Sequence, residues 1–527
     1  MPASADDHGP EGAHERRRLV ARAGTVGAGT LASRVLGLLR DMALAALFDR
    51  EATDAWWVAF TIPNAMRQLL GEGAVAAAVV PVLSEKLARD GDAAARTFFA
   101  RVRGASLLAL VVATALGVLL ARPLTELFAA GYHAHPGQFE RTAALTRAVF
   151  PYILFMGTAA LGAAALNASR RFAVAAFAPG LLNVALLAAA FALPGPLSAH
   201  GLDPALALAA GALAGGVLQV VAQWPALRSL GYAERPVFAM DRDVAEVLRR
   251  IAPLTFGIGI YYIDLVLSRR FLSELGTGAQ SYFSWAMRVC DFPQGIFVLA
   301  LSTAALPSLS TLAAKKAHDE FAKTWAHGVG LAMFVAMPAS VALVTMGEPI
   351  VAVLFQRGHF DAVAVHQTAR ALFWQGGAIW TVAAVRQTVP ALYALGDTRT
   401  PVVVSAIDLV AFIVLAVVLR GPWGHVGISA AVAGSSAVQM VLLLGGLKLR
   451  LGSLPAADLA RSLGRTLVAS AVAAAAGVAA ARLGGGALAA IAGMVAFATV
   501  YVLAAWGLRS PELDEITGAV RRRLRKR

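Results

Sequence analysis

The sequence predicts an all-α polytopic membrane protein with fourteen transmembrane helices, arranged as two six-helix lobes plus two C-terminal helices. Three observations carry this prediction. The 527 residues are 58% hydrophobic and only 15% charged, with a mean hydropathy of +0.66. Apolar runs long enough to cross a hydrocarbon core of about 30 Å recur along the whole chain. Alternation of apolar and polar residues with a period of two is absent, which argues against an outer-membrane barrel.

The elements follow from these apolar runs in chain order. The predicted spans are 24–47, 54–83, 104–121, 144–166, 173–194, 204–226, 251–268, 280–306, 326–346, 366–394, 401–419, 426–446, 466–481 and 486–507. They give a cytoplasmic N-terminal tail (1–23), an N-lobe (24–226), a cytoplasmic linker (227–250), a C-lobe (251–446), helices 13 and 14 (447–508) and a basic cytoplasmic tail (509–527). Because the first 22 residues are polar and precede no cleavage site, we expect no cleaved signal peptide.

The connections between spans alternate between Lys/Arg-rich and Lys/Arg-poor. The rich side comprises the N-terminus, 86–103, 170–171, 228–250, 315–323, Arg399, 448–465 and the tail from Arg509. The poor side holds only Arg50, Arg122, Arg141, Arg269, Arg270, Arg357, Arg420 and Arg482. The positive-inside rule therefore places both termini in the cytoplasm. This bias accounts for most of the net charge of +14 and removes the case for nucleic acid, while the terminal "RRRLRKR" suits anionic lipid.

Cysteine and histidine give no sign of metal or redox chemistry. Cys290 is the one cysteine, and no paired Cys/His spacing typical of a zinc or iron-sulfur site occurs. The ten histidines lie largely in termini, loops and helix ends; His359 and Asp361, in "RGHFD", fall in an outer loop as surface or gate residues. We therefore expect no catalytic residue, no metal and no cofactor.

Several arginines fall inside predicted spans, where each costs about 2.5 to 3.5 kcal/mol at mid-bilayer on insertion scales. Arg147 and Arg370 lie near the outer surface and are expected to snorkel. The remaining candidates are Arg34, Arg40, Arg67 and Arg288, with Asp41, Glu72 and Asp291 as nearby acids. Arg288 and Asp291 share a helix face, but the pairing of the set is partial. We therefore expect one electropositive cavity, and because guanidinium binds phosphate bidentately, a phosphate or pyrophosphate cargo.

Two segments far apart in the chain look alike. One begins "ATDAWWVAFTIPNAMRQLL" at Ala52 and the other "AQSYFSWAMRVCDFPQGIF" at Ala279, and both close on Pro-x-Leu-Ser, at Pro81 and Pro307. Each carries an arginine, an acid, proline and glycine in mid-span. The repeat predicts two six-helix halves that bind cargo between them, with broken helices lining the site.

Motifs along nearly the whole chain resemble the MurJ/MviN family of lipid II flippases, of the multidrug/oligosaccharidyl-lipid/polysaccharide exporter superfamily. They are "SRVLGLLRD" (33–41), "ATDAWWVAFTIPNAMRQLLGEGA" (52–74), "FAPGLLN" (177–183), "MRVCDFPQGI" (287–296), "LFQRGHFD" (354–361) and "YALGDTRTPV" (393–402). The resemblance implies transport of the undecaprenyl-pyrophosphate-linked peptidoglycan precursor, lipid II, from the inner to the outer leaflet of the bacterial cytoplasmic membrane. It also suggests contact with other cell-wall synthesis proteins.

Carried over by position, the family's cavity arginines are Arg34, Arg40, Arg67 and Arg288, and the accompanying acids are Asp41, Asp54, Glu72 and Asp291. One departure concerns the seventh helix, which in many members ends in Val-Asp-Arg with the aspartate implicated in sodium binding. Here the residues are Leu267, Ser268 and Arg269. Asp264 and Asp408 are alternative sites for a monovalent cation or a proton, or plain helix-packing acids, and the coupling ion stays open.

The inside-negative membrane potential would favour outward movement of the anionic head by about 2.3 kcal/mol per charge per 100 mV. Three alternatives remain beside the lipid II flippase. A flippase for another polyprenyl-pyrophosphate-linked glycan fits the charges equally well. A multidrug exporter would need an excess of intramembrane acids, and an intramembrane enzyme acting on lipid phosphates would need a nucleophile or an acid/base pair.

Overall fold

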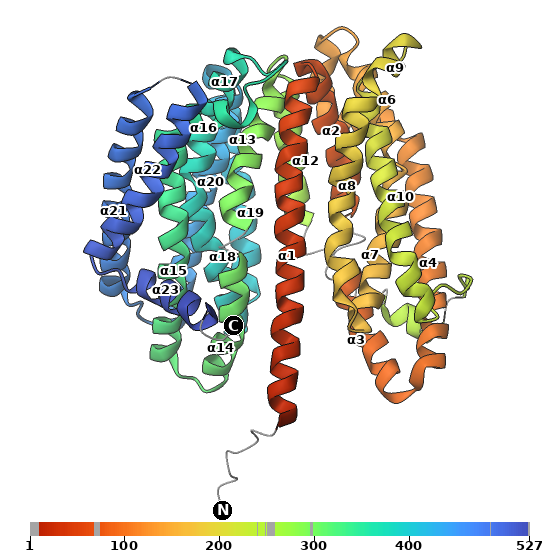
Figure 1. Ribbon diagram of the computed structural model, residues 1–527, viewed down its shortest axis with the longest axis horizontal. Helices are drawn as coiled ribbons and strands as arrows, with labels where there is room; N and C mark the ends of the chain where they lie inside the picture. The colour runs from red at the N-terminus through yellow and green to blue at the C-terminus, as the bar shows by residue number, and fades with distance from the viewer. Residues whose placement is uncertain are drawn as a thin grey trace, which may run out of the picture. The chain divides into compact units, whose positions relative to one another are not determined.

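The computed structural model describes residues 10–67, 74–239, 241–247, 249, 259–295, 299–484 and 486–524. Throughout these ranges the regular structure is helical, without β-strands (Figure 1). Nine helices within the same ranges are long and apolar enough to cross a membrane. The predicted all-α membrane class is thus confirmed, whereas the number of fourteen spans stays a prediction.

The chain forms two compact units. Unit 1 comprises residues 1–48 and 55–262, and unit 2 comprises residues 49–54 and 263–527. Helix α2 (Arg50–Arg67) therefore gives its first turn to unit 2 and the rest to unit 1. This assignment matters for the site, because Asp54 belongs to the same unit as the helices from the second half of the chain.

Unit 1 is a bundle in which α8 packs between α1 and α10, while α7 packs against α3, α4 and α10. Besides α2, its helices are α1 (Pro10–Leu47), α3 (Ala74–Arg89), α4 (Gly91–Leu119), α5 (Ala121–Ala129), η2 (Ala130–Ala134), α6 (Gln138–Val149), α7 (Tyr152–Ala168), α8 (Phe172–Ala192), α9 (Pro194–Ala199) and α10 (Leu206–Ser229). Helix α1 begins at Pro10, so the predicted N-terminal tail is helical from that residue onward.

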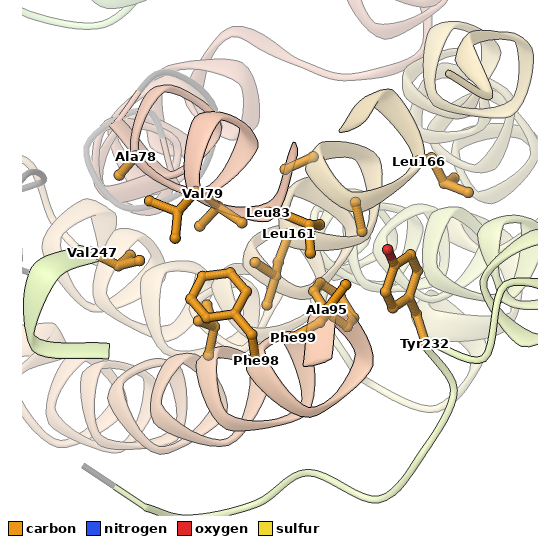
Figure 2. Close-up of a cluster of buried hydrophobic side chains, with 14 of the residues drawn as sticks. Ala78, Val79, Leu83, Ala95, Phe98, Phe99, Leu161, Leu166, Tyr232 and Val247 are labelled. Atoms are coloured by element: carbon orange, nitrogen blue, oxygen red, sulfur yellow. The ribbon is translucent and has the colours of Figure 1, made fainter. Parts of the chain in front are cut away.

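The predicted cytoplasmic linker (227–250) belongs to unit 1 and packs against its helices. Tyr232, Val244 and Val247 are buried with residues of α3, α4 and α7, including Phe98 and Phe99 (Figure 2). Polar contacts add to this core: Lys86 Nζ lies 2.8 Å from an Asp243 carboxylate oxygen, and Arg101 is paired with Asp241. The sequence reveals the charges of the linker, but not that its apolar residues complete a core.

Unit 2 contains α12 (Gly259–Ser273) from Ile263 onward and all helices that follow it. These are α13 (Ala279–Pro293), α14 (Leu299–Ala314), α15 (His318–Thr345), α16 (Gly347–Phe355), α17 (Ala362–Gly377), α18 (Ile379–Ala394), α19 (Arg399–Trp423), α20 (His425–Leu451), α21 (Ala456–Arg482), α22 (Gly486–Gly507) and α23 (Pro511–Leu524). The last two predicted spans form the hairpin α21–α22, which packs on α15.

One predicted span, 366–394, is divided at Ala378 into α17 and α18. The span 54–83 overlaps α2 and α3, and the span 280–306 overlaps α13 and α14; residues 68–73 and 296–298 lie outside the described residues. The four described helices of the predicted repeat each contain a proline.

Candidate functional site

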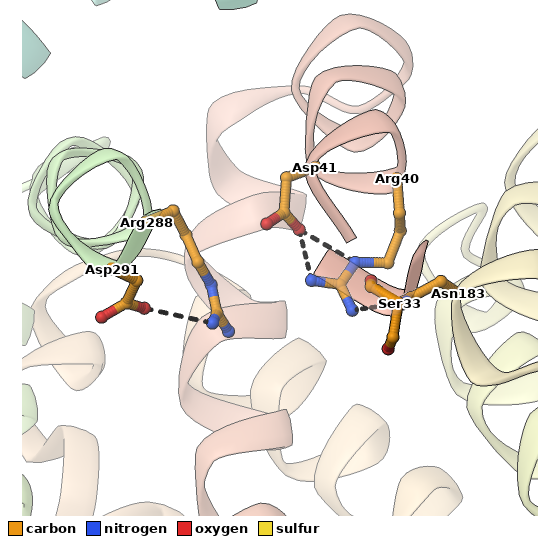
Figure 3. A network of polar contacts seen from close by, with 6 residues as sticks. All are labelled: Ser33, Arg40, Asp41, Asn183, Arg288 and Asp291. Carbon is orange, nitrogen blue, oxygen red and sulfur yellow. Dashed lines mark hydrogen bonds and ion pairs between the residues drawn. The ribbon is translucent and has the colours of Figure 1, made fainter. Parts of the chain in front are cut away.

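In unit 1, α1 carries Arg34, Arg40 and Asp41. The Arg40 guanidinium donates to one carboxylate oxygen of Asp41 through Nε (2.9 Å) and Nη2 (2.7 Å), and to Asn183 Oδ1 on α8 through Nη1 (2.7 Å) (Figure 3). Asp41 is 4% exposed. Arg34 lies six residues earlier on the same helix and is half-buried. The structure therefore pairs Asp41 with Arg40, its neighbour on the same helix.

Close packing of α1 on α8 positions this cluster. A Cβ atom at Gly29 would lie 2.7 Å from the carbonyl oxygen of Ala176, so a larger residue would push the two helices apart. Further along the interface, Asn183 Nδ2 donates to the carbonyl oxygen of Ser33 (2.9 Å). Asn183 lies in the motif "FAPGLLN", but nothing in its sequence signals that its side chain holds an arginine of another helix.

In unit 2, α13 carries Arg288 and Asp291. Arg288 Nη1 lies 3.5 Å from Asp291 Oδ2, and the two side chains are 35% and 52% exposed (Figure 3). The predicted contact between these residues is thus confirmed, but it is a long, exposed ion pair. Arg67 is the last residue of α2, its side chain is outside the described residues, and Glu72 lies wholly outside them.

Asp54 caps a helix of the other repeat segment. It is 1% exposed, and its carboxylate accepts from the backbone N–H groups of Gly278 (2.5 Å) and Ser281 (2.8 Å), where α13 begins. The neighbouring Thr53 hydroxyl lies 2.7 Å from that of Ser281. A buried carboxylate at a helix N-terminus is stabilised by these donors and by the helix dipole. Asp54 therefore joins α2 to α13.

A second contact of the same segment involves the motif "RGHFD". Asp361 begins α17, where its side chain accepts from Ala364 N (2.8 Å), and Arg50 Nη2 lies 2.5 Å from its other oxygen. The Ala364 N–H and the Arg50 guanidinium hold the pKa of Asp361 below its usual value. Asp361 is thus a helix cap and an ion-pair partner of α2.

The prediction that Arg269 lies in a polar connection is wrong. Arg269 is in α12 and is 5% exposed, and its Nη1 donates to Gln280 Oε1 (3.0 Å) and Ser284 Oγ (2.6 Å) of α13. Ser268, where the resemblance implies an aspartate, is also buried at 5% exposure. Polar side chains on α13 solvate this arginine, and no spacing rule could have identified them.

Asp264 and Asp408, on α12 and α19, lie close enough for their charges to interact. Asp408 Oδ1 is buried without a hydrogen-bond partner among the described residues. The structure thus brings two carboxylates of unit 2, from α12 and α19, near each other. Over the described part of the chain, no group of three or more His, Cys, Asp or Glu side chains is arranged to hold a metal ion.

Known proteins resemble this chain in sequence. Residues 44–492 match the family model described as "Lipid II flippase MurJ". The chain is 34% identical to a probable lipid II flippase MurJ of Bdellovibrio bacteriovorus, over 82% of this chain and 83% of that protein. It is 33% identical to the lipid II flippase MurJ of Burkholderia cenocepacia, over 81% and 83% of the two chains.

Solved structures show the same fold. A lipid II flippase MurJ in an inward closed conformation superposes with a TM-score of 0.76 at 20% identity, covering 91% of this chain and 97% of that one. An inward-facing MATE-family multidrug transporter of the MOP superfamily gives a TM-score of 0.66 at 14% identity, covering 80% and 94%. Given the extent of the family match and the identity of its relatives, the chain belongs to the MurJ lipid II flippase family.

Proposed function

We propose that this protein moves lipid II, the undecaprenyl-pyrophosphate-linked disaccharide-peptide, from the inner to the outer leaflet of the bacterial cytoplasmic membrane by alternating access. The observation that carries the proposal is the family match over residues 44–492, which contains Arg67 and Arg288. Arg34 and Arg40 precede it on α1. The protein acts as a transporter without changing the chemistry of its cargo, and both its termini lie in the cytoplasm.

In this mechanism Arg34, Arg40, Arg67 and Arg288 bind the pyrophosphate while the polyprenyl chain stays in lipid. Guanidinium groups suit this task because they stay charged in a low-dielectric site and bind phosphate oxygens in pairs. Asp41 and Asn183 hold Arg40 in one orientation before cargo binds, through the contacts at 2.7 to 2.9 Å. Preorganisation of this kind lowers the entropy cost of binding.

The membrane potential drives the outward step, because a head with about two negative charges gains several kcal/mol across an inside-negative membrane. After release, the site loses the negative charge of the pyrophosphate, so the return step is the costly one. We propose that a monovalent cation or a proton at Asp264 and Asp408 biases this return. The buried Oδ1 atom of Asp408, which lacks a partner among the described residues, supports a role for a bound cation or proton there.

Transport is tested with purified protein in lipid vesicles that contain labelled lipid II. We expect the label to reach the opposite leaflet chemically unchanged. A labelled polyprenyl-pyrophosphate carrying an O-antigen or capsule unit should move much more slowly. Hydrolysis products would favour an intramembrane enzyme, and equal rates for both cargoes would favour a less selective glycan flippase.

Coupling is tested by thermal unfolding of the purified protein in sodium, lithium or potassium salts and across a pH series. We expect one of these conditions to raise the unfolding midpoint of the wild type and not that of Asp264→Asn or Asp408→Asn. Asp458→Asn, which removes an exposed acid paired with Arg461, is the matched control and should behave as the wild type. If no cation and no pH change separates the variants from the wild type, these acids only pack helices.

The proposed partners beyond lipid II are the enzymes that make and use it. This part of the proposal is tested by asking whether cell-wall synthesis proteins co-purify with the full chain. The result is compared between native and detergent-solubilised membranes.

A further inference from the structure

A cavity of about 280 Å³ lies in unit 2 where the N-terminal ends of α15, α21 and α23 meet. Its polar lining comes from all three helices: Lys323, His327, Asp458, Arg461, Ser462, Arg465 and Glu512. Three separate Lys/Arg-rich segments, 315–323, 448–465 and the tail from Arg509, thus contribute to one place. None of these residues takes part in the cargo site or the proposed cation site described above.

The acidic side chains of the cavity already have ion-pair or hydrogen-bond partners. Asp458 pairs with Arg461 at 2.7 Å, and Glu512, which is 5% exposed, accepts from Ser462 (2.5 Å) and Ser510 (2.6 Å). On the rim, His327 Nε2 lies 2.8 Å from a Glu515 carboxylate oxygen. The charge of Asp458 is thus matched by Arg461, and the bases of the lining, Lys323, Arg461 and Arg465, still outnumber its two acids.

The remaining cations have no such partners. Lys323 and Arg465 are exposed, and neither has an ion-pair partner among the residues that the structure describes. They come from two helices that pack against each other, so the cavity presents an ammonium and a guanidinium group on adjacent walls. That combination suits an anion with several oxygens, above all a phosphate group.

The position of Lys323 and Arg465 relative to the membrane narrows the choice of ligand. Lys323 lies just before the predicted span 326–346, and Arg465 immediately precedes the predicted span 466–481. Both therefore lie at the predicted membrane boundary, on the side that the Lys/Arg bias assigns to the cytoplasm. Basic pockets between transmembrane helices on this side are suited to the head groups of anionic phospholipids.

We propose that this cavity binds a phosphate group, supplied by the head group of an anionic phospholipid of the cytoplasmic leaflet or by a soluble phosphate ester. Lys323 and Arg465 contact the phosphate oxygens, and Ser462 stays engaged with Glu512. The bound phosphate bridges α15 and α21. The inference is independent of the cargo, because it concerns binding measured in the absence of lipid II.

The test uses the full chain in a neutral detergent, titrated with short-chain phosphatidylglycerol and followed by native mass spectrometry. We expect the double variant Lys323→Ala/Arg465→Ala to bind phosphatidylglycerol at least about tenfold more weakly than the wild type, because two charge-assisted contacts are lost. The matched control, Lys315→Ala/Lys448→Ala, removes the same charge from exposed residues outside the cavity and should bind as the wild type does.

Two further arms identify the source of the phosphate. Phosphatidylcholine should bind no better to the wild type than to the double variant, and Arg465→Lys should keep part of the affinity. Competition by glycerol phosphate at concentrations similar to those of phosphatidylglycerol would assign the site to a soluble ester instead. The proposal would be overturned if the double variant unfolds as the wild type does and also binds phosphatidylglycerol equally well.

Discussion

Two ion pairs with the same residue types lie in very different surroundings. In unit 1, Arg40 and Asp41 are 13% and 5% exposed, contact each other at 2.7 Å, and share Asn183 of α8. In unit 2, Arg288 and Asp291 are 35% and 52% exposed and lie 3.5 Å apart on one helix. The first pair is part of a helix interface that fixes its arginine, whereas the second is a surface-like pair of little strength. The comparison indicates that Asp41 and Asn183 fix the orientation of Arg40 more firmly than Asp291 fixes that of Arg288.

The largest expected effect is at Arg288. Arg288→Ala should abolish complementation of a flippase-depleted strain and slow lipid II movement in vesicles by tenfold or more, because a charge-assisted phosphate contact contributes about 1.5 to 3 kcal/mol. Membrane levels of the variant should stay normal. Arg147→Ala, at an exposed arginine of α6, is the control and should complement fully. Full growth with Arg288→Ala would remove this residue from the site.

The acids of the two pairs should differ in their effect on stability. Asp41→Ala leaves a largely buried guanidinium without its anion and should lower the free energy of unfolding by about 3 kcal/mol. Asp291→Ala removes an exposed partner and should change it by no more than about 0.5 kcal/mol. Unfolding of both variants in detergent gives the comparison directly. Equal losses would contradict the distinction drawn between the two pairs.

A third ion pair, Asp397 with Arg450, tests whether a buried acid stabilises the fold when its basic partner is exposed. Asp397, 3% exposed, accepts from Thr400 N (3.0 Å), Thr400 Oγ1 (2.8 Å) and the exposed Arg450 (2.7 Å). These donors, with Thr400 N–H first, lower the pKa of Asp397 from 3.8 to about 2. A lowered folded-state pKa stabilises the fold fully above the unfolded value, and this contribution is lost as the pH falls through the folded value.

Asp397→Asn should therefore cost at most about 2 kcal/mol at pH 7. The difference from the wild type should persist down to about pH 4 and shrink below it, when unfolding is measured as a function of pH. A gap that stays constant into acid would mean that packing, not the charge, stabilises this connection between α18 and α19.

The effect on stability expected at Asn183 lies between those at Asp41 and Asp291. Asn183→Ala should cost about 1 kcal/mol, because contacts to Arg40 and Ser33 are lost. Asn183→Asp should instead slow transport more than it lowers stability, since a second carboxylate beside Arg40 competes with the pyrophosphate. Asn167→Asp, on α7, is the matched control. If Asn183→Asp transports at the wild-type rate, Arg40 does not contact the cargo.

Much of the fold could be predicted from the sequence because each membrane span requires a long run of apolar residues. The hairpin α21–α22 and the long helices α8, α10, α19 and α20 follow from long, mainly apolar runs, and a run of this length without period-two alternation crosses lipid as a helix. Helix breaks were harder to place. Ala378, which separates α17 from α18, directly follows Gly376 and Gly377, but glycine is too common in membrane helices to mark a break by itself.

In the candidate site, too, some residues could be identified from the sequence and others could not. The arginines could be identified because an ionised side chain in an apolar run is too costly to be incidental. Their partners could not, because Asn183, Gln280 and Ser284 are ordinary polar residues until packing brings them to Arg40 and Arg269. Arg269 itself was placed outside the spans, since buried polar partners on another helix leave no trace in local sequence.

The sequence by itself determined the helical membrane class, the Lys/Arg asymmetry and the residues whose charge demands a function. These depend on the local cost of placing each side chain in lipid or water, which composition and spacing report. Only the tertiary structure decided that Asp54 caps α13, that Arg40 is held by Asn183, and that Lys323 and Arg465 line one cavity. Those facts depend on contacts between residues far apart in the chain, which no local pattern records.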